Sequence, residues 1–192
     1  VGFPMDLPGI IQSYPQVCNY LDLPLQHISD RILSSMRRGS GSAAVRKLLD
    51  HIRTHFPNLA LRTTMITGYP GETQKEYDEL IGFIKEYRFE RLGAFTYSHE
   101  EDTPAYDLAD DVPPELKEER LAGLMEAQQS ISLEHNMKLI GSDLPVLVDR
   151  VEGNLFIGRT EWDSPEIDNE VIITSPVPLQ VGEFCKVRIT DA

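Results

Sequence analysis

Residues 61–73 constrain the fold more than any other part of the sequence. Residues 61–67 are rich in apolar and β-branched side chains, the composition of a parallel strand covered on both faces. Two glycines and a proline follow, which favour a sharp turn, and Thr73 with Glu76 forms a capping-box pattern that begins a helix. Such a junction presents backbone N–H groups at the carboxyl end of the strand, where α/β folds bind small anionic ligands.

The flanking sequence repeats this alternation of strand and helix. We predict strands at 20–26 and 91–98, with helices after Ser29, at 45–56 and after Thr73. This order implies right-handed crossovers and a parallel sheet. Three parallel strands cannot close a barrel, so we expect the bare edge of the first strand to be covered by segment 1–17 or by another copy of the chain.

At Gly141 the apolar period changes from helical to alternating. Four short strands follow, separated by glycine and proline turns, at 144–151, 155–160, 171–174 and 184–190. A small antiparallel barrel is the expected arrangement, because closure protects the edges of short strands. The sequence therefore predicts an α/β domain at 1–139 and a β domain at 140–192.

Charge and cysteine content limit the classes of function. The chain has 31 acidic and 18 basic residues, a net charge of −13, which opposes sequence-blind nucleic-acid binding and suits basic partners. No apolar run approaches the ~20 residues of a membrane span, and no signal peptide is visible. Cys18 and Cys185 are too far apart in sequence for a local metal site. These features predict a cytoplasmic protein with reduced thiols that does not contact membranes.

Several motifs together resemble the radical S-adenosylmethionine methylthiotransferase family. They are Asp-Leu-Pro-Leu-Gln-His-Ile-Ser-Asp at 22–30, Met-Arg-Arg at 36–38, the stretch 61–73, Phe-Thr-Tyr-Ser at 95–98 with Thr-Pro-Ala at 103–105, and Gly-Arg-Thr at 158–160. The resemblance covers about residues 2–192. It implies the second half of a radical-SAM partial (β/α)6 barrel, followed by a small antiparallel β-barrel known as a TRAM domain.

The resemblance also implies a larger parent protein. Members of the family bind S-adenosylmethionine and two 4Fe-4S clusters, using a further N-terminal domain and a Cys-x-x-x-Cys-x-x-Cys loop at the start of the barrel. Neither feature occurs in this sequence, and two cysteines cannot supply the three thiolates that hold such a cluster. We therefore expect no metal ligand and no catalytic residue in this chain, and no activity from it alone.

The substrate is suggested by Gln-His-Ile-Ser-Asp at 26–30. This run resembles the branch of the family that modifies an aspartate of the twelfth small-subunit ribosomal protein. Members of that branch cleave S-adenosylmethionine to a radical, abstract hydrogen from the β-carbon and insert a methylthio group. The tRNA-modifying branch usually has Gln-Ser-Gly-Ser there. Two alternatives therefore stay open, namely a tRNA methylthiotransferase and a non-catalytic module that binds a basic protein.

Six residues are candidates for binding the cofactor, because the resemblance places it across the C-terminal ends of the strands. Gln26 ends the first strand, although a buried structural amide is the alternative. Arg62 requires an anion, either the cofactor carboxylate or an internal acid. The full set is Gln26, Arg62, Thr64, Gly68, Glu72 and Tyr97.

The β domain is expected to contact a protein substrate. From residue 140 to 192 it has ten acidic and four basic residues, so we expect its surface to repel phosphate and not to bind RNA. Trp162 lies among acids, which suits a basic ribosomal protein, with the aromatic side chain as an anchor. The alternative is a solvated acidic loop with Trp162 packed inward. The substrate candidates are Trp162, Asp163, Glu166 and Asp168.

Overall fold

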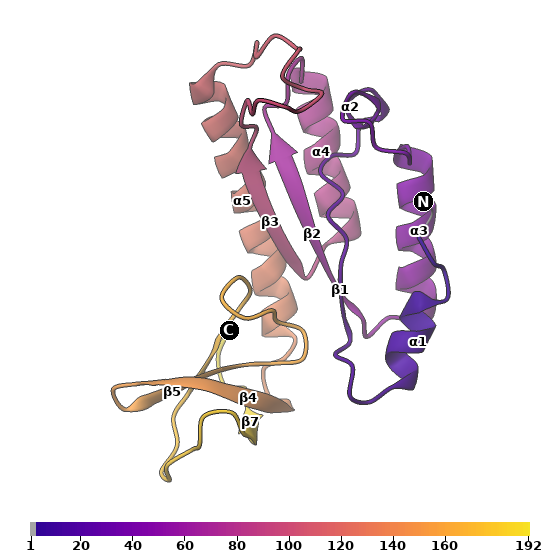
Figure 1. Cartoon of the computed structure of the whole chain (residues 1–192). Helices are drawn as coiled ribbons and strands as arrows, with labels where there is room; N and C mark the ends of the chain where they lie inside the picture. The colour runs from indigo at the N-terminus through magenta and orange to yellow at the C-terminus, as the bar shows by residue number, and fades with distance from the viewer. Residues whose placement is uncertain (1–2) are drawn as a thin grey trace.

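The computed structural model describes residues 3–192, whose helices and strands form two groups (Figure 1). In chain order they are α1 (Leu7–Ser13), β1 (Tyr20–Asp22), α2 (Asp30–Ser35), α3 (Ser42–His55), β2 (Ala60–Thr67), α4 (Gln74–Tyr87), β3 (Arg91–Thr96), α5 (Pro114–Met137), β4 (Asp143–Glu152), β5 (Leu155–Arg159), β6 (Val171–Ile173) and β7 (Phe184–Arg188). Within residues 3–192, no helix is long and apolar enough to span a bilayer. The first two residues of the predicted domain 1–139 lie outside this range.

The first group contains a parallel sheet in the order β1-β2-β3. Helices α2 and α3 connect β1 to β2, and α4 connects β2 to β3, as the alternation in the sequence predicts. The predicted strand at 20–26 is interrupted after Asp22, and the chain rejoins the sheet at Gln26 through a bridge to Met65. Pro24 lies within this interruption, because proline has no N–H to donate to a ladder.

The two faces of the parallel sheet have different environments. Along β2 the alternate residues from Leu61 to Thr67 are buried, whereas Arg62, Thr64 and Ile66 are half-buried. Helices α4 and α5 lie behind the sheet in Figure 1, and residues of α3, α4 and α5 pack in one core with the buried residues of β2. The opposite face, which we call the open face, therefore presents its side chains to solvent at the carboxyl ends of the strands.

The core between the sheet and the helices is mostly apolar, with buried polar residues on β2, at Thr63 and Thr67, and along α5. From apolar residues alone, the sequence predicts that Leu121, Leu124, Met125 and Ile131 form the inner face of this helix. Leu124 and Ile131 are buried, but Met125 is 38% exposed. The buried stripe of α5 also includes three polar residues, Lys117, Arg120 and Gln128. Our sequence-based expectation for this helix was therefore incomplete, because it used only apolar side chains to define the inner face.

The described residues of segment 1–17, which are 3–17, add no strand to the outer edge of β1. Helix α1 instead packs beside α3 (Figure 1). Ile11 joins the core, and a Cβ added at Gly9 would lie 3.7 Å from the ring of Phe56, which follows α3. Within residues 3–192, β1 pairs with β2 alone. Residues 3–17 therefore do not pair with this edge, because the apolar residues of α1 are buried against a helix, and cover by another copy of the chain stays a prediction.

The second group is a four-stranded antiparallel sheet in the order β6-β5-β4-β7. Its core contains Val146, Val148 and Ile173, which alternate with outward-facing residues along their strands. A register shift between Val148 and Arg150 marks a bulge in β4, and bulges increase the bend of a strand. The sheet curls into a half-barrel, as expected for a small β domain, and it lies below the N-terminal ends of the parallel strands in Figure 1.

Candidate functional site

The candidate cofactor site lies on the open face, where three strands bring residues from distant parts of the sequence together. Gln26 follows β1, Thr64 lies in β2, and Tyr97 directly follows β3. All three are half-buried. Arg62 lies on the same face of β2, nearer to the N-terminal ends of the strands. This arrangement leaves partly accessible polar side chains on one surface.

Gln26 has a left-handed backbone with φ of 73°, which is uncommon for a residue other than glycine. Its N–H donates to the carbonyl of Thr64, and its carbonyl accepts from the N–H of Ile66, each at 2.8 Å. These two bonds hold the strained residue in place. Residues in such conformations concentrate at functional sites.

Arg62 is engaged by two carboxylates of the chain. Its guanidinium lies 3.0 Å from Asp22 of β1 and 3.3 Å from Asp168 of the β domain. It also lies over Gly93, where an added Cβ would be 3.2 Å from the guanidinium nitrogen. The structure thus supplies the internal acid that we weighed against a cofactor carboxylate. Burial lowers the pKa of Arg62, but the charges of Asp22 and Asp168 raise it by more. The pKa of Arg62 is therefore raised above its ordinary value.

The glycine turn after β2 does not present free N–H groups to a ligand. Gly68 donates to the carboxylate of Glu72 at 2.8 Å, and Gly71 donates to Asp111 at 2.6 Å. The N–H of Thr73 donates to Glu76 at 2.8 Å, which completes the predicted capping box. The expectation that this turn binds an anion is therefore contradicted, because carboxylates of the chain already accept these bonds.

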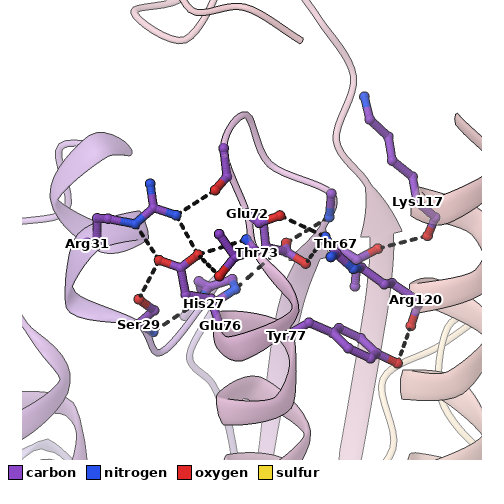
Figure 2. A network of polar contacts seen from close by, with 12 residues as sticks. His27, Ser29, Arg31, Thr67, Glu72, Thr73, Glu76, Tyr77, Lys117 and Arg120 are labelled. Atoms are coloured by element: carbon purple, nitrogen blue, oxygen red, sulfur yellow. Dashed lines mark hydrogen bonds and ion pairs between the residues drawn. The ribbon is translucent and has the colours of Figure 1, made fainter. Parts of the chain in front are cut away.

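Glu72 lies at the centre of a buried polar network (Figure 2). Its carboxylate is 3.0 Å from Arg120 and 3.8 Å from Nε2 of His27. Burial raises the pKa of Glu72, while Arg120 and the Gly68 N–H oppose that rise. Glu72 was a candidate for cofactor binding, but its side chain is fully buried behind the turn. Its carboxylate ties β2 and the turn to α5.

His27 is fully buried beside the carboxylate of Glu72, so its ring packs inside the protein and is not available to a ligand. Its Nδ1 accepts the N–H of Ser29 at 3.0 Å, which leaves the proton of the neutral ring on Nε2. Burial lowers the pKa of His27 to about 4. The folded protein thus keeps this ring neutral well below its ordinary pKa of about 6.5.

This shift predicts a pH dependence of stability. The unfolded chain protonates His27 near pH 6.5 and the folded chain near pH 4, so the free energy of unfolding falls as pH drops between these values. We expect a contribution of about 2 kcal/mol lost between pH 7 and pH 5. The raised pKa of Glu72 has the opposite effect, because it increases the free energy of unfolding as pH falls. A variant that lacks His27 is therefore needed to separate the two contributions.

Urea denaturation of His27→Asn at pH 7 and pH 5 provides the measurement, since asparagine retains an acceptor near the Ser29 N–H. We expect a flatter pH dependence than in the wild type. His55→Asn is the matched control, because His55 is exposed. Equal slopes for His27→Asn and the wild type would contradict the assignment.

Tyr97 is held by aromatic and charged neighbours. Its ring makes an edge contact with Tyr69, with centroids 5.2 Å apart, and Lys117 lies 5.1 Å from its centroid. Lys117 also pairs with Asp110 at 2.6 Å. These contacts fix Tyr97 between the glycine turn and the acidic loop that precedes α5.

The substrate candidates in the β domain divide into two pairs. The carboxylates of Asp163 and Asp168 are buried and bound to the first domain, through Arg91 and Arg62 respectively. Our expectation that these two belong to a free acidic surface is contradicted by this geometry. Trp162 is half-buried beside a cavity of about 340 Å³, and Glu166 is exposed.

The residues that our sequence analysis missed are Lys117 and Arg120 of α5, and Asp110, the acidic partner of Lys117. Lys117 and Arg120 lie three residues apart, on the same face as Leu124 and Ile131. Bases at such positions indicate buried acids nearby, and this signal was available in the sequence. Among residues 3–192, no group of three metal-ligating side chains is arranged around a common point.

Comparison with known proteins adds three findings. The family model for the TRAM domain matches residues 140–192. A protein of Christiangramia forsetii named ribosomal protein uS12 methylthiotransferase RimO is 55% identical over 192 residues, which is all of this chain and 43% of the relative. A protein of Chlorobium limicola with the same name is 53% identical and is covered over 45% of its length. The chain thus spans less than half of these relatives.

A solved structure agrees with the fold. Coproporphyrinogen III oxidase (HemN) from Escherichia coli, described as a radical SAM enzyme, superposes with a TM-score of 0.53 at 19% identity, covering 65% of this chain and 30% of that chain. The chain therefore has the fold of part of a radical-SAM barrel, followed by a TRAM domain. Within that class its similarity is to the RimO methylthiotransferases, over its whole length. The family resemblance of the motifs is confirmed.

Proposed function

We propose that this chain is part of a radical S-adenosylmethionine methylthiotransferase that modifies an aspartate of ribosomal protein uS12. The observation that carries the proposal is its similarity to RimO proteins, 55% and 53% identical across the whole chain. The radical-SAM type of fold supports the same class of enzyme. A protein acting on this substrate works in the cytoplasm, where ribosomes are made.

In this proposal the open face contributes to the cofactor site. Gln26, Thr64 and Tyr97 offer an amide and two hydroxyl groups, which suit the ribose and amino-acid parts of S-adenosylmethionine. Their partial exposure fits this role. When bound, the cofactor and its iron–sulfur clusters supply the radical and sulfur chemistry. We place the cysteines that hold the clusters in the rest of the parent protein, so the chain alone is not competent.

The β domain contributes to recognition of a protein rather than RNA. All four of its basic side chains already have carboxylate partners: Arg150 with Glu152 and Glu170, Arg159 with Asp149, and Lys186 and Arg188 with Asp143. A phosphate backbone would have to compete with each of these acids. Glu166 remains exposed and suits a basic ribosomal protein.

Titration of the whole chain with purified uS12 and with tRNA, at two salt concentrations, tests this recognition. We expect uS12 to bind more tightly, with an affinity that falls as salt rises. Glu166→Gln should weaken binding by about two- to fivefold, as expected for a partly exposed charge pair. Glu118→Gln is the control, because it removes an equal charge from an exposed site on α5. Tighter, salt-sensitive binding of tRNA would move the assignment to the tRNA-modifying relatives.

A further inference from the structure

One loop of the β domain, residues 160–169, contacts all three strands of the parallel sheet near their N-terminal ends. The side chain of Asn19, next to β1, donates to Glu161 at 3.0 Å. The Tyr20 hydroxyl of β1 donates to Asp168 at 2.8 Å, and Arg62 of β2 lies 3.3 Å from the same carboxylate. A single loop therefore joins both domains through polar contacts.

The third strand has the most buried of these contacts. Nε of Arg91 in β3 donates to Asp163 at 2.6 Å, and the side chains are 7% and 2% exposed. Thr160 donates to the other oxygen of Asp163, so this carboxylate is satisfied from both domains. A buried charge is tolerated only when it is paired and hydrogen-bonded. Asp163 and Arg91 thus depend on each other.

Asp168 is satisfied in the same way. Its side chain is 4% exposed, and besides Tyr20 and Arg62 it accepts the N–H of Ser164 within its own loop at 2.9 Å. Burial, followed by the hydrogen bond and charge of Asp168, raises the pKa of Tyr20, so its hydroxyl stays a donor. The contact therefore persists at ordinary pH.

Two pockets lie beside these pairs at the boundary between the domains. A cavity of about 440 Å³ lies between Arg91, Asn136 and the ends of the β sheet, and a second of about 340 Å³ adjoins Trp162. Asn136 and Asn169 add one hydrogen bond across the boundary, at 3.1 Å. The buried apolar residues form separate clusters in the two domains, so the charged pairs are buried contacts that join two separate cores.

We infer that two ion pairs, Asp163 with Arg91 and Asp168 with Arg62, hold the β domain in one orientation on the parallel sheet. We call these two pairs the clamp. The two domains then unfold as one unit and move as one rigid body. The clamp holds the β domain at the opposite end of the strands from Gln26 and Tyr97. The inference rests on the interdomain contacts and does not depend on the proposed function.

Calorimetry and small-angle X-ray scattering of the whole chain test the clamp. We expect one unfolding transition for the wild type. In the double variant with Asp163→Asn and Asp168→Asn, which keeps side-chain size, we expect two transitions, the lower one about 5 to 10 °C below that of the wild type. The radius of gyration should increase. Two transitions in the wild type itself would also overturn the inference.

The control removes an ion pair that lies within the β domain and does not join the two domains. Arg150 and Glu170 pair within the β domain and are exposed, so Glu170→Gln should leave one transition and an unchanged scattering profile. If the double variant does not fold, Tyr20→Phe removes only the hydroxyl bond to Asp168 and should still broaden the transition. A single transition as sharp as that of the wild type, together with wild-type scattering, in the folded variants would overturn the clamp.

Discussion

Replacing Glu72 by alanine is expected to lower the free energy of unfolding by about 3 to 5 kcal/mol. The substitution removes the carboxylate that pairs with Arg120 at 3.0 Å, and the guanidinium stays buried with 4% of its side chain exposed. It also leaves the N–H of Gly68 without its acceptor. An uncompensated buried charge is among the most destabilising defects that a single substitution creates.

Urea denaturation at pH 7 measures this loss. Glu134→Ala is the control, because Glu134 pairs with Arg88 at the surface with 60% of its side chain exposed. That change should cost less than about 1 kcal/mol. Replacing Arg120 by methionine in the Glu72→Ala background should recover part of the loss, since it removes the orphaned charge. Equal effects of Glu72→Ala and Glu134→Ala would contradict the structural role given to Glu72.

Replacing Gly68 by alanine is expected to destabilise the chain by about 3 kcal/mol. Gly68 has a φ of +71°, and a Cβ added there would lie 2.3 Å from Cγ of Lys117. Lys117 cannot withdraw easily, because its amino group is fixed by Asp110 and by the carbonyl of Tyr97. The loss therefore combines backbone strain with displacement of a buried side chain.

Gly82→Ala is the matched control for this substitution. Gly82 lies within α4, and no heavy atom lies within 4 Å of an added Cβ. Alanine favours a helix over glycine, so we expect a gain of about 0.5 to 1 kcal/mol. Thermal unfolding of both variants provides the comparison. A Gly68→Ala variant as stable as the wild type would show that the turn has a different conformation.

The elements near the central strand could be predicted because their determinants are local. The β-branched run of β2, the glycine turn and the capping box of Thr73 and Glu76 lie within a short stretch, and each appears in the structure as expected. Periodicity likewise located α3 and its buried Val45, Leu49 and Ile52. Local signals of this kind need no knowledge of tertiary contacts.

The polar contacts could not be predicted, because their partners are far apart in the sequence. Arg62 and Asp168 are 106 residues apart, and Glu72 and Arg120 are 48 residues apart. A count of acids and bases gives the sign of the net charge of a domain, but it does not show which charges are paired within the structure. The acids that we assigned to a substrate surface therefore included two that bind the first domain.

The central claim is that this chain is part of a methylthiotransferase acting on uS12, and a chimaera tests it most directly. This chain would replace the matching residues of the Christiangramia forsetii relative, which supplies the remaining 57% of the protein. After anaerobic reconstitution with iron and sulfide, the chimaera would be incubated with S-adenosylmethionine, a reductant and uS12. Mass spectrometry should find a methylthio group on an aspartate of uS12, as with the unaltered relative. An unmodified uS12, while the relative remains active and the chimaera folds and carries its clusters, would contradict the account.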